Sequence, residues 1–481
     1  MLIRHTLLYL PAQFIGPAIQ FISIIIWAYV LTPADVGIVT LIIAMQEMSF
    51  AVFFMWWSHY ALRFISGFKG SERRKRFLSS ELTALFICGA LQSAVVIPAL
   101  MLYFPKDMPP VALATTALFM LTRSVNNYMS ERARSEAYIG LYTFIQTAGP
   151  LFGLVFGLAL LFEVSRSPAS ILGGFAIMQT LSLLIAFRLS DLGRVRPRFD
   201  RELLFDAAHF GIPVMMASML ALVAINAPRF VVEHYMGLAA VGAFSVGYGL
   251  GLRASSVAVM LVTVGAYPLV VRKMEQEGVE AAYEQMAKNI TLVGLVVIPV
   301  AFGLLAVNTS VVDLVIPPDY REATYLILPL ATIGGLMRYL RAHTTDQVFL
   351  VRSRPGFITM ISVVDLIFGV LSSYFGLRLG GIAGAALGPV ISGAMTFAAS
   401  LLLSRLILGF RFPVFPLLAI TASAALMGAI VYNTPPGPGF LGLGLRVALG
   451  AVIYAGAIIA LFPPARHRAF IAARKLSTRA S

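Results

Sequence analysis

The strongest constraint on this chain is a succession of hydrophobic runs, each about twenty residues long, separated by short segments that carry most of the charge. A run of this length is what an α-helix needs to cross the hydrocarbon core of a bilayer. Only helices and closed barrels satisfy their backbone groups in lipid, and barrel strands would alternate in polarity over about ten residues. The sequence therefore predicts an all-α polytopic membrane protein.

The hydrophobic runs predict about fourteen transmembrane helices. We expect them at 7–31, 38–64, 79–104, 111–130, 138–162, 171–190, 208–232, 238–271, 289–307, 323–350, 357–377, 380–404, 414–433 and 441–462. No intervening segment is long enough for a catalytic domain outside the membrane. This argues against a membrane glycan polymerase or ligase, the alternative from another functional class.

The loops between these helices alternate in charge. If the N-terminus is inside, the cytoplasmic segments hold 26 of the 36 Lys and Arg residues, whereas the opposite loops hold only Lys106, Arg166, Arg321 and Arg378. Cytoplasmic loops of membrane proteins are enriched in Lys and Arg, so we expect both termini in the cytoplasm. This topology also explains the net charge of +14, and we expect no nucleic-acid partner.

A short motif occurs twice and indicates an internal repeat. Leu31-Thr-Pro-Ala-Asp-Val-Gly37 and Met236-Gly-Leu-Ala-Ala-Val-Gly242 both place Ala-x-Val-Gly between two predicted helices. Glycine suits such a turn because it tolerates positive φ and close helix approach. The repeat predicts two six-helix bundles at 1–190 and 208–404, with a cytoplasmic linker at 191–207, two additional helices within 414–462 and a basic tail at 463–481. Chance similarity of two loops remains the alternative.

Ionisable side chains deep in a membrane are costly, and they usually face a cavity or a charged partner. Within the predicted helices the arginines are Arg123, Arg229, Arg253, Arg338, Arg341 and Arg446, and the acids at similar depth are Glu47, Asp346 and Asp365. Arg229 and Arg446 lie near helix ends and can snorkel to the interface. For Arg253 and Arg338 snorkelling is hardest, which favours a functional role.

The helix predicted at 323–350 is the most polar one. Arg338 and Arg341 are three residues apart and so share one face, and Asp346 lies at its edge. Such a helix lines either a water-filled cavity or a packed polar core. Asp365 on the next helix is a candidate counter-charge for either arginine, and an ion pair and a role in proton or cation coupling both remain open.

The sequence predicts no cofactor and no enzymatic activity. The single cysteine, Cys88, lies inside an apolar run, and no Cys/His spacing typical of a metal site is present. The sequence also lacks a phosphate-binding P-loop, a Gly-rich dinucleotide motif and a G-x-S-x-G elbow.

Several motifs together resemble the Wzx-type polysaccharide flippases of the multidrug/oligosaccharidyl-lipid/polysaccharide exporter superfamily. They are the first Ala-x-Val-Gly motif followed by Arg63, Phe210-Gly-Ile-Pro-Val-Met215, Asn226-Ala-Pro-Arg-Phe230, Val241-Gly-Ala-Phe-Ser-Val-Gly-Tyr248 and Gly381-Ile-Ala-Gly-Ala-Ala-Leu-Gly388. The chain departs from the family at Pro228, where an acidic residue usually precedes the arginine.

This resemblance implies two bundles around a central cavity and a flippase for an oligosaccharide linked to undecaprenyl pyrophosphate in the bacterial inner membrane. A polysaccharide polymerase and glycosyltransferases would be its partners. The substrate is anionic, so we expect arginines to bind it: Arg253, Arg338 and Arg341 first, then Arg123, Arg63 and Arg229. A lipid II flippase and a multidrug antiporter are the alternatives within the superfamily. The excess of deep arginines over acids argues against the antiporter.

Overall fold

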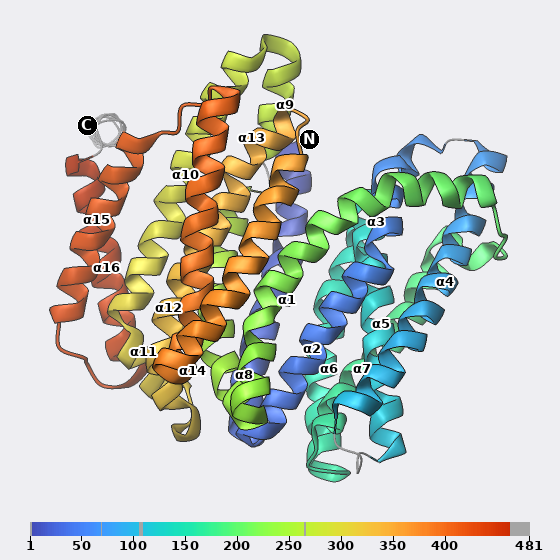
Figure 1. The fold of residues 1–481 in the computed structure, drawn as a ribbon, viewed down its shortest axis with the longest axis horizontal. Helices are drawn as coiled ribbons and strands as arrows, with labels where there is room; N and C mark the ends of the chain where they lie inside the picture. Colours follow the sequence, from blue (N-terminus) through green and yellow to red (C-terminus); the bar gives the residue numbers. More distant parts are fainter. Residues whose placement is uncertain (1, 69, 105–108, 264–265, 462–481) are drawn as a thin grey trace, which may run out of the picture. The chain divides into compact units, whose positions relative to one another are not determined.

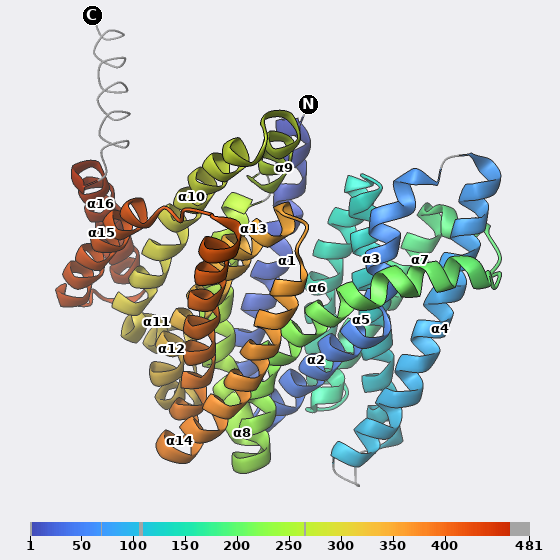
Figure 2. The same ribbon diagram turned by 45° about the horizontal axis from the view of Figure 1, so that its top comes forward.

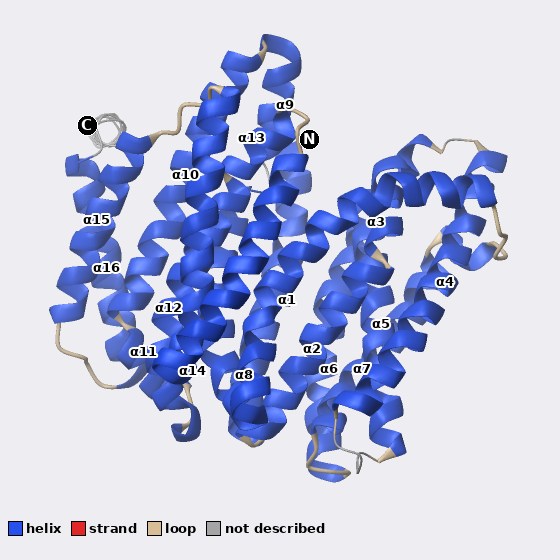
Figure 3. Ribbon diagram, in the orientation of Figure 1, coloured by secondary structure: helices blue, strands red, loops and turns tan. Residues whose placement is uncertain are grey.

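The computed structural model describes residues 2–68, 70–104, 109–263 and 266–461, and all regular elements in these ranges are helices (Figure 1 and Figure 3). By its internal contacts the chain forms two compact units, residues 1–245 and 246–481. Together with the apolar character of the helices, this confirms an all-α fold with many membrane-spanning segments.

Unit 1 contains seven complete helices and the first part of an eighth. These are α1 (Leu2–Val30), α2 (Pro33–Phe53), α3 (Met55–Phe64), α4 (Ser71–Tyr103), α5 (Pro110–Ser135), α6 (Ile139–Glu163), α7 (Pro168–Leu189) and α8 (Arg201–Thr263), with short 3-10 turns η1 (Ile65–Gly67) and η2 (Asp191–Arg194). An aromatic cluster that includes Phe54, Trp57, Tyr60 and Phe77 forms part of its core.

Unit 2 begins within α8 and contains the remaining helices. These are α9 (Ala266–Glu277), α10 (Val279–Ala306), α11 (Asn308–Val315), α12 (Pro318–His343), α13 (Thr345–Val351), α14 (Gly356–Leu408), α15 (Val414–Asn433) and α16 (Gly439–Leu461). Helix α15 packs against both α10 and α16 (Figure 2). Ile420 and Ala424 of α15 belong to the same buried cluster as Val297 of α10.

Two of the described helices each run through a glycine at which the sequence predicts a boundary between two helices. The predicted pair 208–232 and 238–271 lies on α8 and α9, and α8 runs through a non-helical Gly237 (φ 80°). The pair 357–377 and 380–404 lies on α14, which contains the non-helical Gly380 and Gly381. Ten described helices, counting each of these merged runs once, are long and apolar enough to cross a membrane. The count of fourteen crossings therefore stays a prediction.

The two copies of the Ala-x-Val-Gly motif contact each other inside unit 1. A Cβ built on Gly37 would lie 2.1 Å from the carbonyl oxygen of Leu238, and one built on Gly242 would lie 1.9 Å from that of Pro33. Each carbonyl belongs to the residue four positions before the opposite glycine, so the contact is reciprocal. Close approach is thus the reason for glycine at both positions, whereas the positive φ falls on Gly237.

Alanine at this contact should destabilise the protein. We expect Gly242→Ala to lower the free energy of unfolding by about 1–3 kcal/mol, because the added methyl group meets backbone atoms rather than a movable side chain. Thermal unfolding of the purified protein measures the change. Gly140→Ala is the control, because a Cβ there has nothing within 4 Å. Equal melting temperatures for the two variants would contradict the close-packing explanation.

Candidate functional site

A buried cluster of opposite charges joins three helices of unit 2. Arg338 and Arg341 lie on α12 and face Asp365 of α14 from one side of their helix. Arg338 Nη2 lies 3.1 Å from Asp365 Oδ1, and Arg341 Nη1 lies 3.2 Å from Asp365 Oδ2. Asp365 is completely buried, so this carboxylate is shared between two guanidinium groups without competition from water.

A break in the helix brings a second carboxylate to the same cluster. Helix α12 ends at His343, Thr344 has non-helical angles (φ −128°, ψ −85°), and α13 begins at Thr345. This break places Asp346 Oδ2 3.2 Å from Arg341 Nε. Ser400 of α14 donates a hydrogen bond of 2.8 Å to Asp346 Oδ1 and fixes the carboxylate from the other side.

The cluster is electrically balanced. Two guanidinium groups face two carboxylates, and Arg338 and Arg341 are only 6% and 4% exposed. This arrangement favours the packed polar core over the open, positive cavity that was the other interpretation of this helix. Arg338 Nη1 is buried and has no hydrogen-bond partner among the described residues. Arg253, on the part of α8 that belongs to unit 2, is partly buried.

A second polar cluster lies in unit 1 and contains three of the predicted site residues. Arg123 of α5 donates from Nε to Gln46 Oε1 of α2 at 3.0 Å. Glu47, the residue after Gln46 on α2, accepts a hydrogen bond of 3.1 Å from Asn226 Nδ2 of α8. The Oδ1 atom of Asn226 accepts a hydrogen bond of 2.6 Å from Arg229 Nη1. Asn226 thus links Arg229 to Glu47, although the acidic neighbour usual in the family is replaced by Pro228.

Two other arginines have different surroundings. Arg63, at the end of α3, is exposed and stacks its guanidinium over the ring of Phe210, 5.1 Å from the ring centroid. Arg446 does not extend outward as expected for snorkelling. It is 5% exposed and donates 2.7 Å hydrogen bonds to Ser310 Oγ and to the carbonyl oxygen of Val431 near the end of α15. Arg446 therefore has a structural role at this helix end.

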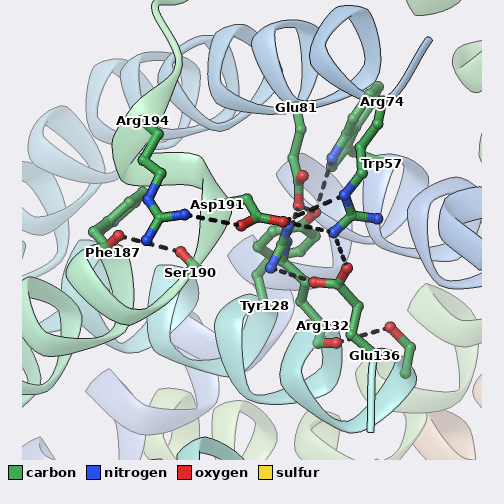
Figure 4. A network of polar contacts seen from close by, with 11 residues as sticks. Trp57, Arg74, Glu81, Tyr128, Arg132, Glu136, Phe187, Ser190, Asp191 and Arg194 are labelled. Carbon is green, nitrogen blue, oxygen red and sulfur yellow. Dashed lines mark hydrogen bonds and ion pairs between the residues drawn. The ribbon is translucent and has the colours of Figure 1, made fainter. Parts of the chain in front are cut away.

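A third network, which was not predicted from the sequence, lies in unit 1 (Figure 4). Glu81 of α4 is fully buried and accepts a 2.7 Å hydrogen bond from Arg132 Nε of α5, and it also accepts one from Tyr128. Arg132 was expected in a cytoplasmic loop. Helix α5 continues to Ser135, past the predicted end at residue 130, and buries Arg132 to 2% exposure.

The same network anchors the segment that follows α7. Arg74 of α4 pairs with Glu136, which also pairs with Arg132 at 2.5 Å, and Arg74 Nη2 lies 3.0 Å from Asp191 of η2 (Figure 4). An acid just inside the apolar run of α4 was the sequence signal for Glu81. Its partners are distant in sequence, so the signal alone could not identify them.

Removing the shared carboxylate of unit 2 should destabilise the protein strongly. Asp365→Asn leaves two buried guanidinium groups without their common counter-charge, and breaking a buried pair costs about 3–5 kcal/mol. We expect a corresponding fall in the melting temperature of the purified protein. Glu275→Gln, at an exposed position without an ion pair among the described residues, should change it little. If both variants melt at the wild-type temperature, the ion pairs do not hold this cluster together.

The fold is shared with solved transporters. The structure titled lipid II flippase MurJ, inward closed conformation, has a TM-score of 0.76 at 14% identity, over 95% of this chain and 99% of that chain. An inward-facing multidrug resistance MATE family transporter of the MOP superfamily has a TM-score of 0.64 at 15% identity, over 83% of this chain and 98% of that chain. A MOP superfamily transporter from Pyrococcus furiosus has a TM-score of 0.58 at 16% identity, over 84% of this chain and 94% of that chain.

No curated protein sequence matches the chain. A family model described as polysaccharide biosynthesis protein matches residues 26–324, which is more than half of the chain. The Wzx-type resemblance of the motifs agrees with this match. The chain is a multi-pass membrane protein, and it belongs to the polysaccharide biosynthesis protein family.

Proposed function

We propose that this protein is a flippase that moves an oligosaccharide linked to undecaprenyl pyrophosphate across the bacterial inner membrane by alternating access. The observation that carries the proposal is the family match over residues 26–324. The shared fold with lipid and drug transporters supports movement of a substrate across the membrane rather than catalysis. A polysaccharide polymerase and glycosyltransferases are the expected partners.

The arginines supply the chemistry that the substrate requires. A guanidinium group offers a planar fork of donors that matches two phosphate oxygens. We propose that Arg338 and Arg341 bind the pyrophosphate together with Arg253, and that Arg123, Arg229 and Arg63 assist along the path. Arg338 Nη1 is buried without a hydrogen-bond partner among the described residues, and we propose that a phosphate oxygen forms its first hydrogen bond with this donor when the site opens.

The carboxylates have a complementary role in this proposal. A buried cation without a partner is costly, and Asp365 and Asp346 offset that cost while the substrate is absent. When the pyrophosphate arrives, its oxygens replace part of the carboxylate contacts with Arg338 and Arg341. Protonation of Asp365 or Asp346 would accompany this exchange and couple transport to protons. Glu47, linked to Arg229 through Asn226, is the corresponding acid in unit 1.

Lipid II is the second candidate substrate, because the lipid II flippase MurJ shares the fold over nearly the whole chain. A multidrug antiporter needs acids that face its cationic cargo, whereas the described acids of unit 2 at this cluster are neutralised by arginine. A membrane glycan polymerase or ligase would form product from the lipid-linked glycan. A transport assay with defined lipid-linked substrates separates these functions.

Export in living cells tests the arginines directly. In cells that lack their own flippase, the wild-type protein should restore surface polysaccharide, whereas Arg338→Ala or Arg341→Ala should reduce export by at least about tenfold, since a hydrogen bond to a charged group contributes about 1.5–3 kcal/mol. Lysine should rescue only partly because it lacks the fork. Membrane levels of each variant are compared in parallel.

The competing explanation is that Arg338 and Asp365 form a purely structural pair. In that case the double variant Arg338→Ala/Asp365→Ala would recover the export that each single change abolishes. Normal export by the double variant would overturn the substrate-binding role. Restored synthesis of cell-wall peptidoglycan instead of surface polysaccharide would identify lipid II as the substrate.

The orientation in the membrane also has a direct test. A cysteine introduced at Pro197 should react with a membrane-impermeant thiol reagent only in opened cells, and one at Pro436 should react in intact cells. The reason is the concentration of Lys and Arg in the loops on the side of Pro197. The native Cys88 is fully buried, so its background labelling should be low. Labelling of position 197 in intact cells would reverse the proposed topology.

A further inference from the structure

A basic surface pocket opens at the beginning of α4 in unit 1. Its volume is about 990 Å³, and its walls come from the first turns of α4 and from the segment between η2 and α8. The cations on these walls include Arg73, Lys75, Arg194, Arg196, Arg198 and Arg201. Glu72 and Asp200 are the acids among the lining residues, so positive charge prevails.

The cations at this pocket fall into two groups. Arg74 and Arg76 hold the pocket together, because Arg74 pairs with Asp191 (Figure 4) and Arg76 pairs with Asp200. The hydrogen bond from Arg76 lowers the pKa of Asp200, so this carboxylate stays ionised and offsets the charge of Arg76 at neutral pH. The backbone N–H of Arg198 also donates to the carbonyl oxygen of Ser79 at 3.2 Å.

The second group faces solvent. In the described part of the chain, Arg73, Lys75, Arg196, Arg198 and Arg201 form no ion pair, and all of these residues are exposed. The ion pairs of Arg74 and Arg76 thus hold in place a segment that presents these five exposed cations. Such a site attracts a ligand with one or more phosphate groups.

An apolar groove adjoins this pocket. Its volume is about 670 Å³, and it runs between α4, α5 and α7 along side chains that include Leu82, Phe86, Leu121, Phe187 and Leu192. Val195 lines both the groove and the basic pocket, and Gly193 of the groove adjoins Arg194 of the pocket in the chain. The two spaces are therefore neighbours, and side by side they offer a ligand a charged end and an apolar end.

The length of the groove indicates what fills it. From Leu82 to Ser93 it follows α4 for roughly 16 Å at 1.5 Å per residue, close to the ~15 Å of hydrocarbon in one leaflet. We propose that this face of unit 1 binds an anionic phospholipid, with its phosphate in the basic pocket and one acyl chain in the groove. A polyprenyl chain is much longer than this groove and would extend beyond it, so we assign the groove to a phospholipid rather than to the transported lipid of the proposed function.

Binding by the purified full-length protein tests the site. Native mass spectrometry with phosphatidylglycerol and phosphatidylcholine of equal acyl chains should show preferential retention of phosphatidylglycerol. The variant Arg73→Gln/Lys75→Gln/Arg196→Gln should weaken phosphatidylglycerol binding by about 10- to 100-fold and leave phosphatidylcholine unchanged, as expected for the loss of cations near an anionic headgroup. The matched control Arg354→Gln/Arg405→Gln/Arg411→Gln removes three exposed cations of unit 2 and should keep the preference for phosphatidylglycerol.

The groove is tested separately. Ala90 lines the groove and is exposed, so Ala90→Trp fills the groove from its open side. This variant should weaken binding of both phospholipids several-fold without changing the melting temperature. Leu102→Trp, at an 88% exposed position of the same helix, should have no effect.

Three results would overturn the proposal. The first is equal binding of the two phospholipids to the wild type, or an unchanged preference in the triple variant. The second is that pyrophosphate without a lipid tail binds as tightly as phosphatidylglycerol and that Ala90→Trp does not change binding. These outcomes would indicate a site for a water-soluble phosphate compound. The third is retention of polyprenyl pyrophosphate in place of phosphatidylglycerol, which would assign the site to the transported lipid. Since none of these measurements involves export, they do not depend on the proposed function.

Discussion

A buried charge requires a counter-charge, and this requirement organises the interior of both units. Water and lipid cannot compensate a guanidinium group inside a helical bundle. In unit 2, Arg338 and Arg341 meet Asp365, while in unit 1 Arg132 meets Glu81 and Glu136. The pairs of Asp365 with Arg338 and Arg341 join α12 to α14, and the pair of Glu81 with Arg132 joins α4 to α5, so the interactions that neutralise charge also fix how these helices pack. In a protein whose helices are apolar on most faces, these contacts specify which faces meet.

The sequence was sufficient to predict the fold class and most helix positions, because the length and polarity of a membrane helix follow from the bilayer itself. Boundaries were predicted less well where a helix continues outside the apolar run. Helix α5 continues through Arg132 to Ser135, since the ion pairs of Arg132 compensate a charge that hydropathy assigns to a loop. The helix break at Thr344 was also missed, because nothing in the local composition distinguishes it from its neighbours.

The candidate site was predictable in part for the same reason. Arg338, Arg341 and Asp365 stand out because charge is rare within apolar runs, and the three-residue spacing places both arginines on one face. Whether these arginines pair with Asp365 depends on how α12 and α14 pack against each other. The spacing of residues along one helix does not give this information. Glu81 and Arg132 escaped notice because each lies at the end of an apolar run, where an exposed charge is the ordinary expectation.

The reciprocal contact between Gly37 and Gly242 has a consequence for how the two turns can move. Each glycine faces the carbonyl oxygen of the residue four positions before the other glycine, so the two turns make the same contact with each other. Contacts of this kind occur where two identical protomers join across a two-fold axis. In this protein both contacts lie within a single polypeptide and form one joint, so a motion that parts the two turns at one glycine also parts them at the other.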